Sequence, residues 1–270
     1  MKILVCMKQV PDTSEVTLDP VTNTLIRKGV RSIINPDDKA GIEAALSLRD
    51  EIGNDSKVIV VSMGPKQAEM ALMEALAMGC DEAYLVSDRK FGGSDTLATS
   101  TILAAALKKI GYDLIITGRQ AIDGDTAQVG PQIAEHLGIP HVSYVEEFSY
   151  DGSAGGNEEA MIVLRQFEDR HHKLRVKCPC LLTAISGYKE PRYITVARVF
   201  EADKKEIKSL NYEDLKDLLD VECIGLKGSP TKVVKSYTKE QKTQGTVLKG
   251  LTTNEAVEAI MARLKEGHIL

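Results

Sequence analysis

The sequence predicts an α/β protein whose open, mostly parallel sheet carries helices on both faces and is followed by an extended C-terminal arm. Three observations favour this fold class. Short β-branched runs alternate with helical patterns over the first 140 residues, short turns connect them, and charged residues are frequent in the last 70. Strands that alternate with helices form a parallel sheet, since each crossover helix returns the chain to the same edge.

The first strand and the first helix have the clearest predicted boundaries. Ile3–Met7 is a short apolar run with the length and composition of a buried strand. Further along, Asn35 is expected to be the N-cap of a helix and Pro36 its first residue, followed by two aspartates that the helix dipole favours. The apolar stripe of this helix ends at Gly53, its expected C-terminus.

The strand-and-helix pattern then repeats three more times. The next helix is expected to open at Pro65, the one after it at a Ser94 N-cap, and a fourth near Val129. A glycine closes each of them. The three strands that precede these helices are Val58–Val61, Ala83–Val86 and Leu114–Thr117.

The pattern changes after Pro140. Three extended segments follow without helices between them: Val142–Phe148, Met161–Phe167 and Lys173–Lys177. The sequence therefore predicts a run of strands after the repeating part of the chain.

The chain after about Pro191 has a different composition. Of the last 70 residues, 24 are charged, and Ala256–Leu264 is the one stretch with a sustained helical period. Such a segment cannot build a core of its own, so we expect it to wrap another surface, of this chain or of a partner. The predicted organisation is an α/β domain at 1–190 that carries the binding site and a C-terminal part at 191–270.

Composition excludes several classes of protein. The net charge of −5 comes without basic runs, which makes nucleic acid a poor partner, and no apolar run approaches the roughly 18 residues of a membrane span. The N-terminal residues read directly into a strand and leave no room for a secretory signal. The five scattered cysteines are odd in number, as expected for a protein of the reducing cytoplasm.

The carboxyl ends of the predicted strands are where a parallel sheet binds ligands. Cys6 and Lys8 follow the first strand, Asn35–Asp38 follow the strand-like pair before them, and Met63 follows the next strand. The segment Gly118–Gly130, after the strand at Leu114–Thr117, is the richest in polar groups and glycine.

This segment has two interpretations. The free backbone N–H groups of a helix N-terminus near Asp125–Gln128, with the Thr126 hydroxyl and the Gln128 amide, would suit a phosphate or pyrophosphate. Alternatively, Asp123 and Asp125 are ordinary turn and N-cap residues, because Asp-Gly-Asp-Thr is also a common turn followed by a cap.

The other motifs in the chain give weaker evidence for a binding or catalytic site. The chain has neither the GxGxxG fingerprint nor a P-loop. Gly92–Thr96 faintly resembles the glycine-rich loop of adenylating enzymes, but an N-cap at Ser94 accounts for it better. Cys178 and Cys180 are separated by one residue and have no second pair, so we expect no metal site. No residue has the context of a catalytic nucleophile, and none is predicted.

The sequence resembles a known family, the β subunits of electron transfer flavoproteins, over nearly its whole length. The specific segments are Val5–Asp12, Gly118–Gly130, Leu164–Ala184 and Glu190–Tyr193. One departure is that Glu168–Arg170 stands where the family usually has an Asp-Gly-Gly turn.

The resemblance implies a fold and a site. The fold would be Rossmann-like, of the adenine-nucleotide alpha-hydrolase kind, and the chain would pair with an alpha subunit. The strand ends would line an adenine-nucleotide site. By the match, its residues would be Cys6, Asn35, Asp38, Met63, Gly118, Arg119, Gln120, Ala121, Ile122, Asp123, Gly124, Asp125, Thr126, Ala127, Gln128 and Val129.

The resemblance also implies a second surface. The charged tail would wrap the alpha subunit, and a recognition loop would anchor a partner dehydrogenase with Val196 as its apolar plug. The residues implied for partner binding are Tyr188, Glu190, Pro191, Arg192, Tyr193 and Val196.

Two branches of the family differ in cofactor. Ordinary members hold a structural AMP in this site. Members of the electron-bifurcating branch hold FAD, take a hydride from NADH, and send one electron to ferredoxin or flavodoxin and the other through the alpha-subunit FAD to an acyl-CoA dehydrogenase. Gly118–Gly130 and Gly225–Thr231 are similar to the bifurcating branch. Gly124 would leave room for a flavin diphosphate, and Arg119 would act as a tuning cation near the flavin.

The sequence also permits three other functions. The chain would be a structural AMP-binding subunit without redox chemistry, a nucleotide-binding stress or signalling domain on the same kind of sheet, or an adenylating enzyme. The Glu190–Tyr193 loop and the wrapping tail argue against the signalling domain.

Overall fold

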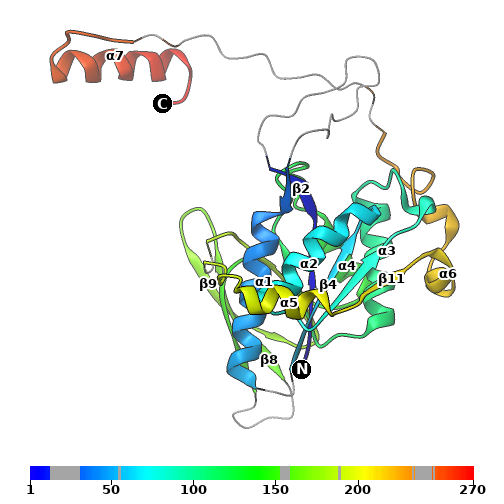
Figure 1. The fold of residues 1–270 in the computed structure, drawn as a ribbon. Coiled ribbons are helices and arrows are strands. Elements are labelled where there is room, and N and C mark those ends of the chain that lie inside the picture. The colour runs from blue at the N-terminus through cyan, green and yellow to red at the C-terminus, as the bar shows by residue number, and fades with distance from the viewer. Residues whose placement is uncertain are drawn as a thin grey trace.

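A computed structural model describes residues 1–12, 31–53, 56–152, 159–187, 190–232, 234, 245 and 247–270. A nine-stranded sheet forms the centre of the α/β body (Figure 1). Its strand order is β11-β5-β4-β1-β6-β10-β7-β8-β9, and every pair is parallel except β7–β8 and β8–β9. The predicted α/β class with a mostly parallel sheet is confirmed.

The strands of this sheet have lengths typical of globular proteins. They are β1 (Lys2–Cys6), β4 (Lys57–Met63), β5 (Glu82–Val86), β6 (Leu114–Gly118), β7 (His141–Asp151), β8 (Ala160–Gln166), β9 (His171–Lys177), β10 (Cys180–Ala184) and β11 (Ile207–Leu210).

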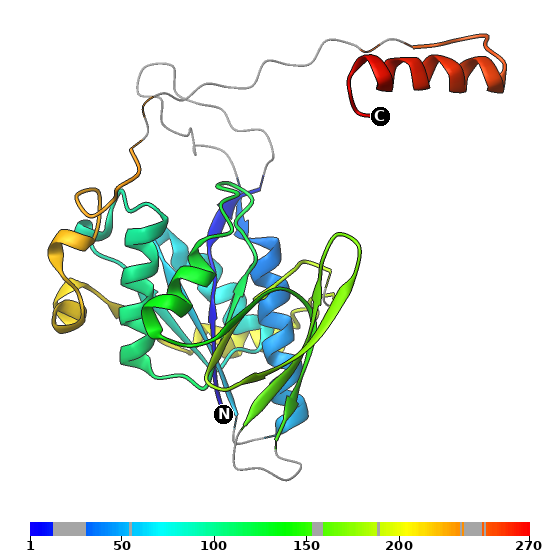
Figure 2. The same ribbon diagram turned by 180° about the vertical axis from the view of Figure 1, so that it is seen from behind.

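Helices cover both faces of the sheet. The helices α1 (Pro36–Ile52) and α2 (Glu69–Met78) lie on one face with α5 (Val196–Asp203), and α3 (Thr96–Ile110) and α4 (Val129–Leu137) lie on the other (Figures 1 and 2). The first strand shows why two cores form, because alternate side chains point to opposite faces. Ile3 and Val5 join one cluster of buried residues, while Leu4 and Cys6 join the other.

Two sequence predictions about local structure were wrong. Asp95, not Ser94, is the N-cap of α3, because its carboxylate accepts the backbone N–H of Ala98 at 3.0 Å. Ser94 instead donates its hydroxyl to the Phe91 carbonyl at 2.8 Å. Asp125 is not a cap either, since α4 starts four residues later with Gln128 at the N-cap position.

The strand-like pair before Asn35 is a strand outside the main sheet. It is β3 (Ser32–Ile34), which pairs antiparallel with β2 (Gln9–Pro11). This small sheet brings the chain after β1 next to the start of α1, because the Asn35 backbone N–H donates to the Lys8 carbonyl at 2.9 Å.

The strands after Pro140 contain a parallel strand that periodicity did not reveal. The strand β10 lies between β6 and β7 and is parallel to both. All five of its residues are buried, as expected for a strand covered on both faces. An apolar run of this length carries no alternation, so its pairing depends on tertiary structure.

The residues after Pro191 pack partly onto the α/β body. The strand β11 pairs with β5, and Leu210, Leu215 and Ile224 are buried in the core on the α3 side. The same part of the chain forms the short helix α6 (Tyr212–Leu215) and two 3-10 helices, Lys216–Leu218 and Val221–Cys223. Two further 3-10 helices, Lys66–Ala68 and Arg89–Phe91, lie in the α/β body. The division of the chain at residue 190 remains a prediction.

The last helix is α7 (Thr253–Glu266), which includes the stretch that showed a helical period. It buries none of its residues against the described parts of the chain (Figure 1). None of the described helices has the length and apolarity that crossing a bilayer demands.

Candidate functional site

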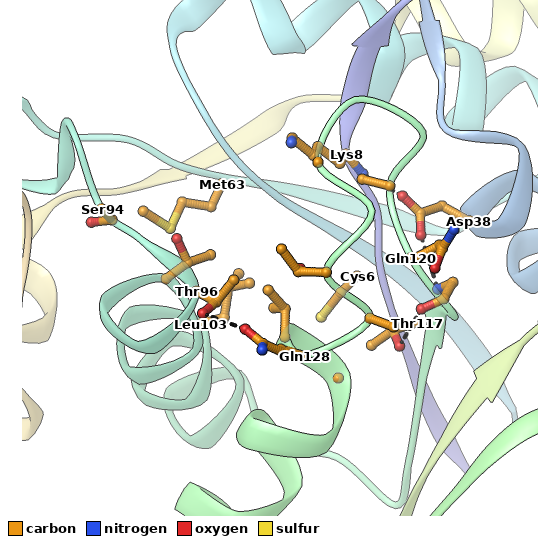
Figure 3. Close-up of a pocket in the computed structure, with 18 of the residues that line it drawn as sticks. Cys6, Lys8, Asp38, Met63, Ser94, Thr96, Leu103, Thr117, Gln120 and Gln128 are labelled. Carbon is orange, nitrogen blue, oxygen red and sulfur yellow. Dashed lines mark hydrogen bonds between the residues drawn. The ribbon is translucent and has the colours of Figure 1, made fainter. Parts of the chain in front are cut away.

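A cavity of about 440 Å³ opens at the carboxyl ends of β1, β4 and β6 (Figure 3). This is the edge where an open parallel sheet binds ligands, and the volume lies within the range of small-molecule sites. The start of α3 and the turn into α4 form the opposite wall, where Thr96 and Gln128 are hydrogen-bonded to each other. The loop 118–130 runs over the cavity between β6 and α4.

Asn35 holds this loop in place. Its side chain is fully buried, and its Nδ2 donates to the Gln120 carbonyl at 2.8 Å while its Oδ1 accepts the Ile122 N–H at 3.0 Å. As the N-cap of α1 it makes no side-chain capping bond. Its carboxamide therefore acts on the loop and does not line the cavity.

Asp38 joins the ends of two strands. Its carboxylate accepts the backbone N–H of Lys8 at 2.8 Å and that of Gly118 at 2.9 Å. Burial raises the pKa of Asp38 to about 7, although these hydrogen bonds favour the charged form. Burial, and then the charge of Asp38, raise the pKa of Cys6 to about 12, so this thiol is neutral and not a nucleophile.

Two glycines permit the loop ends to pack closely. A Cβ on Gly130 would lie 2.7 Å from Oγ1 of Thr117, and one on Gly118 would overlap the Asp38 carboxylate. Gly124 differs, because a Cβ there would meet nothing within 4 Å. The side of the loop at Gly124 is thus open.

The turn that leads into α4 offers a set of unpaired donors. The backbone N–H groups of Thr126 and Ala127, which precede the helix, and of Gln128, its N-cap residue, find no acceptor among the residues that the structure describes. Ala127 has φ of 52°, a left-handed conformation that is uncommon for alanine and turns the chain into the helix. Donors of this kind bind anions such as phosphate.

The wall formed by α3 is supported from the C-terminal part of the chain. The Asp95 N–H donates to Oγ of Ser229 at 2.8 Å, and the Asp95 carboxylate accepts the Thr231 N–H at 2.9 Å. This wall is joined to the turn before α4, because Oγ1 of Thr96 donates to Oε1 of Gln128 at 2.9 Å. Segment Gly225–Thr231 therefore positions one wall of the cavity.

The cations at the cavity are paired. Lys8 Nζ lies 2.7 Å from an Asp123 oxygen, which joins the end of β1 to the loop. Arg119 Nε lies 3.4 Å from Oδ2 of Asp37, and its guanidinium lies 5.6 Å from the centre of the Tyr144 ring. Both pairs hold the loop, and both cations also border the cavity.

Most residues predicted for the site come together at this cavity. Asn35, Ile122, Asp123 and Asp125 do not line it: the first two hold the loop together, Asp123 pairs with Lys8, and Asp125 accepts Nε2 of Gln120 at 2.8 Å. The predicted residues that do line it are Cys6, Asp38, Met63, Gly118, Arg119, Gln120, Ala121, Gly124, Thr126, Ala127, Gln128 and Val129.

Sequence reasoning missed the wall on the α3 side. Gly92–Thr96 only weakly resembles a glycine-rich loop, and the signal that could have revealed it is its place after β5 in a parallel sheet. Because α3 and α4 pack together, this loop faces the one after β6. The additional lining residues are Met7, Lys8, Phe91, Gly93, Ser94, Asp95, Thr96, Thr99, Leu103, Thr117 and Gly130.

The residues predicted for partner binding lie on another part of the surface. Tyr193 and Val196 are 91% and 73% exposed, whereas the Arg192 side chain is turned inward. Glu190 is exposed and Pro191 half-buried directly before them. Tyr188 lies outside the described residues.

Comparison with known proteins places similar sequences along the whole chain. The electron transfer flavoprotein domain model matches residues 22–215. The chain is 54% identical, over the full length of both proteins, to the electron transfer flavoprotein subunit beta of Clostridium acetobutylicum. It is similarly 49% identical to the caffeyl-CoA reductase-Etf complex subunit CarD of Acetobacterium woodii, and 47% identical to the acryloyl-CoA reductase electron transfer subunit gamma of Anaerotignum propionicum.

Each of these alignments covers the whole of this chain and of the relative. The shared family thus extends over the cavity, the exposed segment around Val196 and the C-terminal part. The chain belongs to the electron transfer flavoprotein family, as one of its β subunits.

Proposed function

We propose that this chain forms a heterodimer with an alpha subunit, binds FAD in the cavity, and serves in electron bifurcation. In this role it accepts a hydride from NADH and divides the electrons between ferredoxin or flavodoxin and, through the FAD of the alpha subunit, an acyl-CoA dehydrogenase. The observation that best supports nucleotide binding is the set of N–H groups in the turn before α4 that find no acceptor in the described part of the chain, and the similarity of Gly118–Gly130 to the bifurcating branch favours FAD as that nucleotide. Since the whole chain aligns with electron transfer flavoprotein subunits, the signalling domain and the adenylating enzyme are not proposed.

The residues present fit a dinucleotide. The N–H groups of Thr126, Ala127 and Gln128 would hold a diphosphate, and the open side of the loop at Gly124 leaves space beside it. Cys6 and Met63 supply apolar and sulfur contacts on the floor. When bound, FAD supplies the hydride acceptor, so the chain itself needs no acid, base or nucleophile.

Arg119 is proposed to tune the flavin. Its guanidinium lies at the cavity edge, with Nε 3.4 Å from Oδ2 of Asp37, and would favour negative charge on a neighbouring ring. Arg119→Ala should therefore lower the flavin reduction potential. An unchanged potential would remove this role from Arg119.

Two relatives support the choice of acceptor. One is named as a subunit of a caffeyl-CoA reductase-Etf complex, and the other as an acryloyl-CoA reductase electron transfer subunit. By analogy, an acyl-CoA dehydrogenase or reductase would be the partner of this chain. Its five unpaired cysteines agree with the proposed location in a reducing cytoplasm.

The second candidate is an ordinary electron carrier in which the same cavity holds AMP. The N–H groups at α4 suit one phosphate as well as two, so the cavity wall alone does not favour either nucleotide. Under this reading the nucleotide is structural and NADH is not a substrate.

The test is a count of flavin and AMP in the complex purified with its alpha subunit. Two FAD per heterodimer without AMP, and bleaching of flavin absorbance by NADH without oxygen, are expected. One FAD with one AMP would favour the ordinary carrier. A complex without flavin would contradict both readings.

A further inference from the structure

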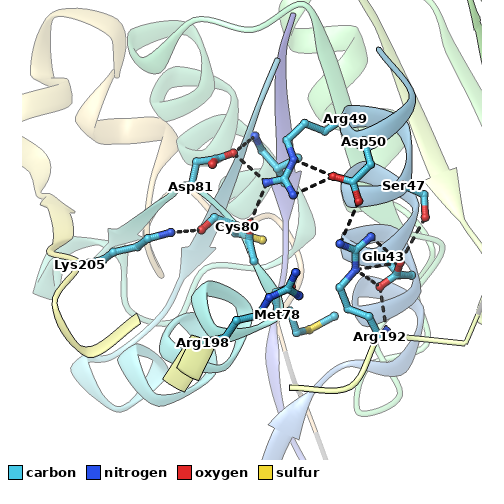
Figure 4. A network of polar contacts seen from close by, with 12 residues as sticks. Glu43, Ser47, Arg49, Asp50, Met78, Cys80, Asp81, Arg192, Arg198 and Lys205 are labelled. Atoms are coloured by element: carbon cyan, nitrogen blue, oxygen red, sulfur yellow. Dashed lines mark hydrogen bonds and ion pairs between the residues drawn. The ribbon is translucent and has the colours of Figure 1, made fainter. Parts of the chain in front are cut away.

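An ion-pair network ties the exposed segment around Val196 to the α/β body (Figure 4). We name residues 190–203, which include α5, the docking segment. Arg192 reaches α1 from this segment, and Arg198 reaches the end of α2, where its guanidinium donates to the Met78 carbonyl at 2.9 Å. Just after the segment, Lys205 donates to the Cys80 carbonyl at 2.7 Å.

The contact between Arg192 and Glu43 is the most buried part of this network. The Glu43 side chain on α1 is only 7% exposed, yet both of its oxygens are hydrogen-bonded. Arg192 donates from Nε and Nη2 at 2.9 Å each, and its backbone N–H adds a third bond at 2.9 Å. Ser47 donates to the same carboxylate at 3.2 Å. The match is between the planar guanidinium fork and the carboxylate.

The network continues along α1 to the start of β5. Arg192 Nη1 lies 3.0 Å from Oδ2 of Asp50, and Arg49 contacts the other oxygen of that carboxylate at 3.0 Å. Arg49 also donates to the Gly79 carbonyl and lies 3.2 Å from Asp81. Burial is the largest single influence and raises the pKa of Asp50, but the hydrogen bonds and charges of Arg49 and Arg192 together outweigh it and lower the pKa below its ordinary value, so the carboxylate is charged at neutral pH.

Burial of apolar surface does not explain why the docking segment is ordered. Of the eight residues of α5, only Ala202 is buried. Tyr193, Val196 and Phe200 are 91%, 73% and 66% exposed. A helix this short is unstable unless tertiary contacts hold it, and here the contacts are made by cations while the apolar side chains face outward.

We propose that Arg192 and Glu43 are positioning residues that hold the docking segment in the orientation its partner recognises. Arg192 then contributes to docking indirectly, from inside the molecule. The pair keeps the apolar residues exposed and preorganised, so that binding the partner costs less ordering entropy. This inference rests on the proposed function, because it assumes that the segment docks an acyl-CoA dehydrogenase or reductase.

The first measurement needs no partner. In the complete heterodimer, hydrogen–deuterium exchange is compared between wild type, Glu43→Gln and Arg192→Lys. Glu43→Gln keeps the size of the side chain and removes its charge, and Arg192→Lys keeps the charge and removes the fork. Both variants should speed exchange across 190–203 by about tenfold or more if the pair holds the segment.

The matched control is Glu74→Gln. Glu74 on α2 forms a pair with Lys39 on α1 at 2.7 Å, but both side chains are about one third exposed, and neither forms a hydrogen bond or ion pair with the described residues of the docking segment. This variant should leave exchange across 190–203 unchanged.

The second measurement is the kinetics of electron transfer to an acryloyl-CoA reductase as the probe. If only a fraction of molecules has the segment in the competent orientation, the apparent affinity falls by that fraction. The KM for the reductase should therefore rise about tenfold in Glu43→Gln and Arg192→Lys, with kcat and cofactor content unchanged. Val196→Asp should raise the KM without altering exchange elsewhere.

The outcomes separate three cases. Unchanged exchange across 190–203 in both variants would overturn the proposal, as would faster exchange with an unchanged KM. A rise in KM accompanied by loss of cofactor and a lower unfolding temperature would mean a merely structural role, and would also overturn it. The proposed function fails if the wild-type heterodimer transfers no electrons to the reductase, or if Val196→Asp and wild type transfer them equally well. In that case the exchange data alone decide whether the pair holds the segment.

Discussion

At the scale of single residues, the chain uses polar side chains near the cavity mainly to hold its own backbone. Asn35 and Asp38 have the residue types expected of ligands, but their hydrogen bonds go to the loop and to strand ends. Sequence position brought them to the correct edge of the sheet. Their partners in the strand β6 and the loop after it are 80 to 87 residues away and could not be read from spacing.

Replacing Asn35 should loosen the loop over the cavity. In Asn35→Ala the Gln120 carbonyl and the Ile122 N–H lose their buried partner, which should cost about 1–3 kcal/mol of unfolding free energy. Urea denaturation and the dissociation constant for FAD measure the two effects. The matched control is Asn211→Ala at an exposed cap of α6, which should leave FAD binding unaltered. If both variants weaken FAD binding equally, Asn35 does not have this role.

Asp38 should give the chain a distinctive pH dependence. Burial raises its pKa from 3.8 to about 7 in the folded chain. Between these values the folded state holds a proton that the unfolded state has released, so the contribution of Asp38 to stability is largest at low pH and falls as the pH rises through this window.

Asp38→Asn removes this titration. Urea unfolding of wild type and variant between about pH 4 and pH 8 should show a flatter profile for the variant. The variant should also be less stable at low pH, because an amide has one acceptor atom for the two N–H groups that Asp38 satisfies. Parallel profiles would show that Asp38 does not titrate in this range.

At the scale of elements, helix boundaries and close contacts depend on different information. Pro36, Gly53, Gly79 and Gly138 mark helix ends through local backbone preferences, and the structure confirms them. The Ser94 prediction was wrong, and the alternative interpretation of Asp125 as a cap is excluded, because several polar residues precede each helix and the sequence does not say which one stands at the N-cap position. Which one does so depends on the neighbouring elements, as Asp95 shows by also accepting the Thr231 N–H.

The packing of α4 against β6 predicts a difference between two glycines. Gly130→Ala would place its Cβ 2.7 Å from Oγ1 of Thr117 and 3.0 Å from Cγ2 of Thr183, and overpacking of this kind costs about 1–3 kcal/mol. Gly124→Ala meets open space and should leave the unfolding free energy unchanged. Thermal denaturation of both variants checks this, and equal stabilities would mean that α4 shifts to make room.

At the scale of the whole molecule, the C-terminal part divides in two. Residues up to about Pro230 complete the sheet and support the cavity wall through Ser229. The helix α7 contributes nothing to the buried core of the described chain. Its exposed apolar residues, such as Val257 and Ile260, suit a surface on the alpha subunit.

Deletion of residues 247–270 tests this division. The shortened chain should keep its unfolding temperature, because α7 buries no residue. Its affinity for the alpha subunit, measured by titration calorimetry, should fall. A large drop in the unfolding temperature would instead place α7 within the fold of this chain.

The sequence by itself determined the α/β class, the order of the first strands and helices, and the edge of the sheet where the cavity opens. These follow from periodicity, glycine and proline positions, and the rule that parallel strands gather their carboxyl ends. The resemblance to electron transfer flavoprotein β subunits indicated the family and most of the residues that line the cavity.

Tertiary structure alone decided the rest. It placed β10 between β6 and β7, added β11 at the far edge, and brought the Gly93–Thr96 wall opposite the loop 118–130. It also turned Arg192 inward to Glu43. The physical reason is common to all four: each is a pairing between segments far apart in the chain, and local preferences carry no information about which distant partner a strand, loop or charge will meet.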